Sequence, residues 1–164
     1  MTPHPAAGQS LNRLAVAATN HCLTGCAIGE VLGLVIAVAA GWGNVAAIAL
    51  AIALAFVFGY ALTMLPLLRA GLAFAEATRL AVGADSVSIA VMEIVDNAIM
   101  LVIPGAMSAG LDAPLFWGAL AVSLAIAWVV AFPVNRWLIA RGRGHAVVHG
   151  RPERGHEDGH LRHH

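Results

Sequence analysis

The residues best able to do chemistry in this 164-residue chain gather in its first hydrophobic stretch. Cys22, Cys26 and Glu30 recur every four residues, so a helix would place them on one face, and His21 borders the same arc. Thiolate ligands suit Cu(I), and mixed sets of Cys, His and carboxylate also suit Zn²⁺. These four side chains therefore predict a metal site, with copper as the first candidate and zinc as the second.

A second polar stripe is expected in the third hydrophobic stretch. Met92, Asp96 and Met100 are spaced by four residues, and so are Glu93 and Asn97. On a helix these five side chains occupy less than half of the circumference. An ionisable group at the centre of a bilayer costs about 2.5–3.5 kcal/mol on insertion scales, and no arginine lies deep in any stretch. The remaining partners are a proton, a metal ion, water or neighbouring polar groups.

Three functions fit these two stripes. The first is binding or transport of a metal ion at a site between the two helices. The second is proton-coupled transport of a small solute, and the third is a structural or assembly subunit whose polar stripe docks a partner helix. No nucleophile–base pair is legible, so no enzymatic activity is predicted, and no pattern favours nucleic-acid binding. The complete set of predicted metal ligands is His21, Cys22, Cys26, Glu30, Met92, Glu93, Asp96 and Met100.

The elements that must position these side chains are expected to be transmembrane helices. Sixty per cent of the residues are apolar, 11% are charged and the mean hydropathy is +0.81, whereas about a quarter of the residues of a soluble domain are charged. A helix needs about 20 residues to cross the hydrocarbon core. Stretches of this length run over about 14–40, 45–68, 86–107 and 116–139. They predict an all-α integral membrane bundle of four transmembrane helices in a lipid bilayer, forming one domain over 14–141.

The arrangement of these helices follows from their direction. The first and third run the same way through the membrane, and their polar stripes lie at overlapping depths, so we expect them to face each other at the centre. The second and fourth carry few internal polar groups and are expected to face lipid. Pro104 is expected to kink the third helix.

The arginines predict the orientation. All nine basic residues are arginines, and every one lies on the side shared by the N-terminus (1–13), the middle loop (69–85) and the tail. An excess of basic residues marks the cytoplasmic face. Both termini are therefore predicted to be cytoplasmic, in a bacterial inner membrane. The middle loop is compatible with a short interfacial helix.

Two further segments carry predictions about partners. Gly25, Gly29 and Gly33 repeat every four residues, a pattern that lets a neighbouring helix approach closely. Because so small a bundle would need to self-associate to build a continuous pathway, these glycines are a candidate contact with a second copy or a partner membrane protein. Residues 142–164 are rich in Gly, Arg and His and predict a flexible cytoplasmic tail. Chelation of a metal in that tail is predicted for His145, His149, His156 and His160.

Three motifs in this sequence resemble a known family. They are HCLTGCAIGE at 21–30, MEIVDNAIM at 92–100 followed by PGAM at 104–107, and PVNRWL at 133–138 followed by GRGHA at 142–146. Together they resemble the bacterial membrane family known as domain of unknown function 4396, over about residues 12–149. The resemblance implies a small multi-pass membrane protein and adds no mechanism. A loose association of that family with copper-handling proteins favours copper as the metal.

Overall fold

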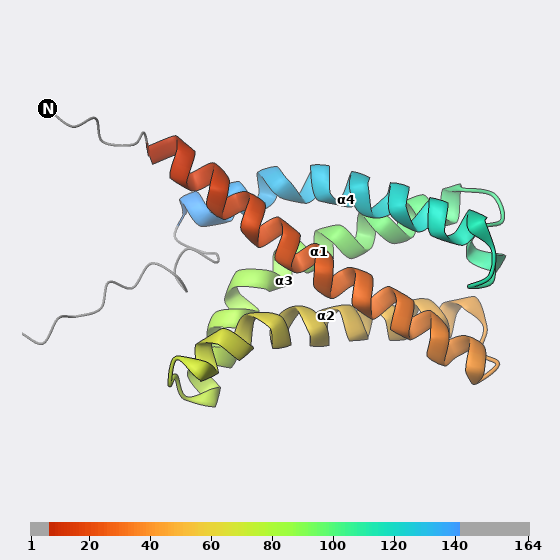
Figure 1. The fold of residues 1–164 in the computed structure, drawn as a ribbon, viewed down its shortest axis with the longest axis horizontal. Coiled ribbons are helices and arrows are strands. Elements are labelled where there is room, and N and C mark those ends of the chain that lie inside the picture. Colours follow the sequence, from red (N-terminus) through yellow and green to blue (C-terminus); the bar gives the residue numbers. More distant parts are fainter. Residues whose placement is uncertain (1–6, 142–164) are drawn as a thin grey trace, which may run out of the picture.

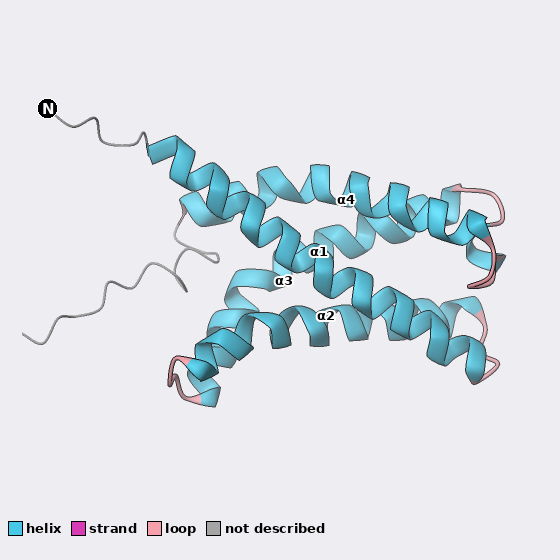
Figure 2. Cartoon of the chain, in the orientation of Figure 1, coloured by secondary structure: helices cyan, strands magenta, loops and turns pink. Residues whose placement is uncertain are grey.

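The computed structural model describes residues 7–141 (Figure 1). They form four long helices, and a short 3₁₀ helix, η1, precedes the last of them. The bounds are Ala7–Ala39 for α1, Asn44–Arg69 for α2, Phe74–Val102 for α3, Ala106–Ser108 for η1 and Pro114–Ala140 for α4. Residues 7–141 contain no β-strand (Figure 2). The predicted all-α four-helix bundle is confirmed.

Three of these helices are long and apolar enough to cross a membrane, namely α1 from Leu11, α2 and α4. The fourth, α3, has 29 residues, or about 43 Å at 1.5 Å per residue. Its average polarity is higher because it carries the acidic residues Asp85, Glu93 and Asp96, each at most 3% exposed. Those carboxyl groups point into the bundle, whereas apolar side chains such as Ile94 and Val102 point outward.

The bundle is organised around a crossing of α1 and α3. Near the middle of α1, Cys22 and Cys26 pack in one buried cluster with Ile89 and Met92 of α3. The first half of α1 lies along α4, and its second half lies along α2 (Figure 1). The predicted meeting of the first and third helices at the centre is therefore found, and α2 and α4 flank the crossing.

Polar side chains join the first half of α1 to α4. Each of three hydrogen bonds joins one residue of α1 to one residue of α4, and the contacts run in antiparallel order. The bonds run from Trp128 Nε1 to Asn20 Oδ1 (2.8 Å), from Asn135 Nδ2 to Thr19 Oγ1 (2.9 Å) and from Arg136 Nε to Asn12 Oδ1 (2.8 Å).

Small residues join the second half of α1 to α2. The pairs are Gly25 with Gly59, Gly29 with Ala55 and Gly33 with Ala51. Four residues forward on α1 match four residues back on α2, as antiparallel helices in close contact require. A Cβ atom added at Gly25 would lie 2.8 Å from the Gly59 Cα, closer than real Cβ atoms come. The glycine face that the sequence offered to a second copy is therefore occupied by α2 of the same chain.

Two boundaries differ from the predicted ones. The middle loop contains only residues 70–73, because α3 begins at Phe74 and runs unbroken through 74–85, so no separate interfacial helix forms there. At its other end α3 stops at Val102 and is not kinked. Pro104 has no N–H to donate and disfavours helical backbone at Ile103, which is extended at φ −76° and ψ 115°. Gly105 then turns the chain with a positive φ of 80°.

Candidate functional site

The buried polar side chains of α3 lie on one face of the helix and form a row. They are Asp85, Ser88, Glu93 and Asp96, none more than 3% exposed. At 100° per residue they fall within about 140° of the circumference, and they extend over about 16 Å along the axis. That length is about half of a hydrocarbon core of about 30 Å. We call these four side chains, with the groups that contact them, the polar row.

One end of the polar row joins three helices. Thr63 Oγ1 of α2 lies 2.9 Å from His21 Nε2 of α1 and donates a 2.5 Å hydrogen bond to Asp85 Oδ2 of α3. A hydroxyl group has a single proton to donate, so Thr63 accepts from an N–H at His21 Nε2 while it donates to the carboxylate. The Cys22 thiol lies 4.0 Å from Asp85 Oδ1. This end therefore contains an imidazole, a hydroxyl and a carboxylate connected in series.

The middle of the polar row contains the Ser88 hydroxyl, two thiols and two apolar side chains. Ile89 and Met92 are 0% exposed, and Cys22 and Cys26 are free thiols at 1%. Cys22 lies beside Ser88, and Cys26 lies beside the Glu93 carboxyl group. Ile89 fills the space that glycine leaves on α2, since a Cβ at Gly59 would lie 2.5 Å from the Ile89 Cδ1. The side chains of Ile89 and Met92 therefore form an apolar layer at the helix crossing.

The other end of the polar row holds a cluster of carboxyl groups. Ser123 Oγ of α4 donates to Asp96 Oδ1, and Asn97 Nδ2 lies 2.9 Å from the Glu93 backbone oxygen and 3.5 Å from Glu93 Oε2. Glu30 of α1 lies beside the Asp96 and Glu93 carboxyl groups. Within residues 7–141, three buried side-chain atoms have no hydrogen-bond partner. They are Ser88 Oγ, Glu93 Oε1 and Asp96 Oδ2, all in the polar row.

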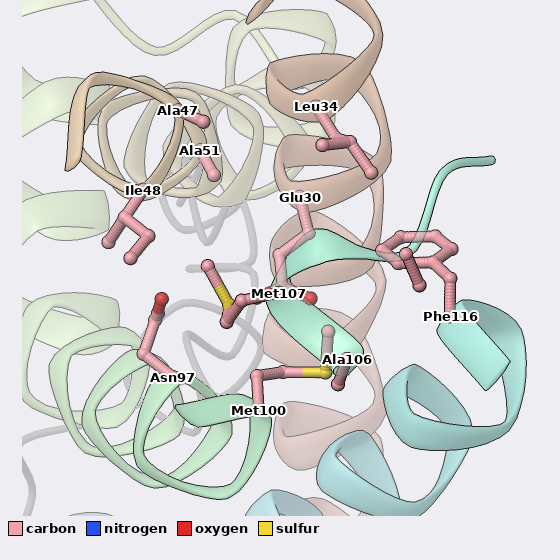
Figure 3. A pocket seen from close by; sticks show the side chains of 11 residues that line it. Glu30, Leu34, Ala47, Ile48, Ala51, Asn97, Met100, Ala106, Met107 and Phe116 are labelled. Atoms are coloured by element: carbon pink, nitrogen blue, oxygen red, sulfur yellow. The ribbon is translucent and has the colours of Figure 1, made fainter. Parts of the chain in front are cut away.

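A pocket adjoins this carboxyl cluster (Figure 3). It has a volume of about 60 Å³ and lies between α1, α2, α3, η1 and the start of α4. The Glu30 side chain points into it. The pocket is lined by Glu30, Leu34, Ala47, Ile48, Ala51, Asn97, Met100, Ala106, Met107, Ala109 and Phe116.

The structure brings many of the predicted site residues to the crossing but does not assemble a metal centre from them. Among residues 7–141, no three His, Cys, Asp or Glu side chains lie close enough to hold a metal ion. His21 is directed to Thr63, and the two thiols lie next to different carboxyl groups. Met92 is buried in the core, while Met100 packs in a second apolar cluster with Phe116. The four predicted tail histidines lie outside the described residues.

Sequence reasoning missed several members of the polar row. Asp85 was assigned to the middle loop, although its spacing of 3, 7 and 11 residues to Ser88, Met92 and Asp96 is that of one helix face. Thr63 and Ser123 are lone small polar residues in otherwise apolar helices, and no spacing distinguishes them. Both side chains are buried and bond acidic residues of α3. The second and fourth helices, α2 and α4, therefore contribute to the site, and the prediction that they face lipid is corrected.

The apolar helices and the buried polar row define the class of this molecule as a small multi-pass membrane protein. The chain belongs to the family described as domain of unknown function (DUF4396), whose profile matches residues 12–144. The match confirms the resemblance carried by the three sequence motifs. No curated protein and no solved structure matches the chain.

Proposed function

We propose that the protein is a proton-coupled transporter of a small solute, in which protons move along the polar row between α1 and α3. The observation that carries this proposal is the pair of acids Glu93 and Asp96, each at least 97% buried with one unpartnered oxygen. An isolated carboxylate in an apolar interior is strongly disfavoured and takes up a proton instead. Neutral acids that gain and lose protons are the groups from which membrane proton relays are built.

The His21 end supports the proposal by its hydrogen-bond geometry. When His21 is protonated on both ring nitrogens, the Nε2 proton moves to Thr63 Oγ1, and the Thr63 proton moves to Asp85 Oδ2. His21 is left as the neutral tautomer with its proton on Nδ1, and Asp85 is left neutral. One proton has then crossed from α1 to α3 with no change in heavy-atom positions. His21 is half-buried, so it can exchange protons with water at that end.

The arginine distribution assigns the His21 end to the cytoplasm in this proposal. A reporter fused after Gly43, in the turn between α1 and α2, is expected to be active only outside the cytoplasm, because that turn carries no arginine. A reporter at the C-terminus is expected to be active only inside. The opposite pattern of reporter activity would reverse the direction assigned to the polar row.

Proton movement is the direct test. In the absence of solute, we expect uncoupled proton movement along the polar row to acidify the lumen of proteoliposomes of the purified protein when a potassium-diffusion potential, negative inside, is imposed, as reported by a trapped pH indicator. Asp96→Asn is expected to lower the rate about tenfold, a barrier increase of about 1.4 kcal/mol. Asparagine has nearly the same shape as aspartic acid, and its amide oxygen can still accept the hydrogen bond from Ser123. It cannot take up and release a proton as a carboxyl group does. The loss is moderate because Glu30 and Glu93 lie beside Asp96.

The matched control is Glu76→Gln, which also neutralises an acid of α3 but lies exposed in the first turn of that helix. Its rate should equal that of the wild type. Equal rates in protein-free vesicles and in wild-type vesicles would contradict proton translocation. The metal content of the purified protein distinguishes proton-coupled transport from the copper hypothesis. A near-stoichiometric metal ion that is lost in the double variant Cys22→Ser/Cys26→Ser would favour metal transport instead.

A further inference from the structure

We infer that the pocket beside Glu30 binds a small organic ammonium ion, which takes the place of a proton on the Glu30 carboxyl group. This inference rests on the proposed function, because it names the chemical class of the solute whose movement the protons drive. The pocket adjoins the unpartnered acids of the polar row, and it is built from parts of all four helices and η1. Changes in helix packing would therefore change its shape.

The polar groups of the pocket select for positive charge. Of its eleven lining residues, the side chains of Glu30, Asn97, Met100 and Met107 carry a heteroatom. The Asn97 amide nitrogen is directed to Glu93, while its oxygen points into the pocket (Figure 3). Carboxylate, amide oxygen and thioether sulfur are all acceptors. A ligand that offers only hydrogen-bond donors, as an ammonium group does, matches this lining, and an anion does not.

The remaining walls of the pocket fit an alkyl group. Leu34, Ile48 and Phe116 are apolar, and the four alanines of the lining leave the space open. Ca²⁺ requires six to eight oxygen ligands, and Mg²⁺ keeps several of its waters, whereas here two side chains supply oxygen. An alkyl ammonium ion satisfies both parts of the site, with its charge at Glu30 and its chain against the apolar walls.

The exchange with a proton balances charge inside the bundle. Glu30 shares its surroundings with Glu93 and Asp96, and none of the three pairs with a cationic side chain among residues 7–141. Before binding, a proton on Glu30 keeps that group neutral. When the ammonium ion arrives, Glu30 releases this proton to the solvent and forms an ion pair, so the carboxyl cluster together with its ligand has the same net charge as the cluster before binding. Ligand and proton therefore compete for one carboxyl group.

The test uses the full-length protein in detergent with ethylammonium chloride as the probe, an ion small enough for a pocket of about 60 Å³. Titration calorimetry measures binding, and a pH indicator in weakly buffered solution measures proton release. We expect binding with release of about one proton per molecule bound at a pH where Glu30 is protonated. Ethanol has the same chain without the charge, so it should bind at least tenfold more weakly, about 1.4 kcal/mol, and release no proton. Glu30→Gln should lose both signals.

Two further variants keep the test decisive if Glu30→Gln fails to fold. Met107→Trp, on the short η1, places a bulky ring in the pocket and should abolish binding while all carboxyl groups remain. Glu76→Gln should behave as the wild type. Equal binding of ethanol and ethylammonium, or unchanged proton release in Met107→Trp, would overturn the site. Proton translocation without amine binding would refute this inference alone, whereas amine binding without translocation would refute the proposed function alone.

Discussion

Replacing Gly29 with alanine is expected to destabilise the folded bundle by about 1–3 kcal/mol or more, the usual cost of overpacking a close-packed interior. The added Cβ would overlap the Ala55 backbone nitrogen and lie 2.6 Å from the Ala55 Cα. Both atoms belong to the backbone of α2, so no side-chain rotation relieves the clash and the two helices must separate. Unfolding in detergent mixtures with rising sodium dodecyl sulfate, followed by circular dichroism, measures the loss.

Gly83→Ala is the matched control for this prediction. Gly83 lies within α3, and a Cβ there would meet no atom within 4 Å. Its replacement should leave the stability unchanged or raise it by up to about 1 kcal/mol, since alanine is the better helix former. A similar midpoint for Gly29→Ala and Gly83→Ala would mean that α1 and α2 are not in backbone contact at this position.

Replacing Thr63 with valine is expected to lower the rate of proton translocation by on the order of 100-fold, the lower range for loss of a positioned proton-transfer group. The Thr63 hydroxyl joins His21 to Asp85, with contacts of 2.9 and 2.5 Å. Valine has a closely similar shape but can neither accept nor donate. The effect should exceed that of Asp96→Asn because the Thr63 hydroxyl contacts both His21 and Asp85, whereas Asp96 has carboxyl neighbours that can take over its role. The proteoliposome assay measures the rate.

Two variants separate loss of the relay from loss of structure. Thr63→Ser restores the hydroxyl and should recover most of the rate. Thr24→Val removes an exposed hydroxyl of α1 that bonds only the Asn20 backbone oxygen, and it should leave the rate unchanged. A wild-type rate in Thr63→Val would show that protons do not pass between His21 and Asp85 through this hydroxyl.

The polar face of α1 and most of that of α3 could be predicted because helical periodicity alone determines which residues share a face. For this reason Cys22 and Cys26 lie at the crossing, and Glu30 meets Glu93 and Asp96 in the carboxyl cluster. The identity of the helix that covers Gly25, Gly29 and Gly33 could not be predicted, since small residues create a groove without specifying its occupant. Only the structure shows that α2 fills it.

The chemistry of the site was harder to predict than its position. The presence of cysteine and histidine suggested metal ligation. The direction of each side chain, however, depends on tertiary contacts that the spacing of residues in the sequence does not reveal. His21 is directed to Thr63, a residue with no distinguishing neighbours in the sequence. The end of α3 was misjudged for a local reason. A proline bends a helix only if the chain beyond it stays helical. Here α3 already ends at Val102, before Pro104, and Gly105 turns the chain away.

The apolar layer of Ile89 and Met92 has an electrical consequence. On either side of it lie polarisable groups: His21, Thr63 and Asp85 on one side, and the carboxyl cluster on the other. A membrane potential falls mainly across the least polarisable part of its path, so this layer carries a large share of the voltage. A charge that passes it gains up to about 2.3 kcal/mol per 100 mV over a short distance. In the proposed relay, the helix crossing is thus where the transmembrane field would act most strongly on a moving proton.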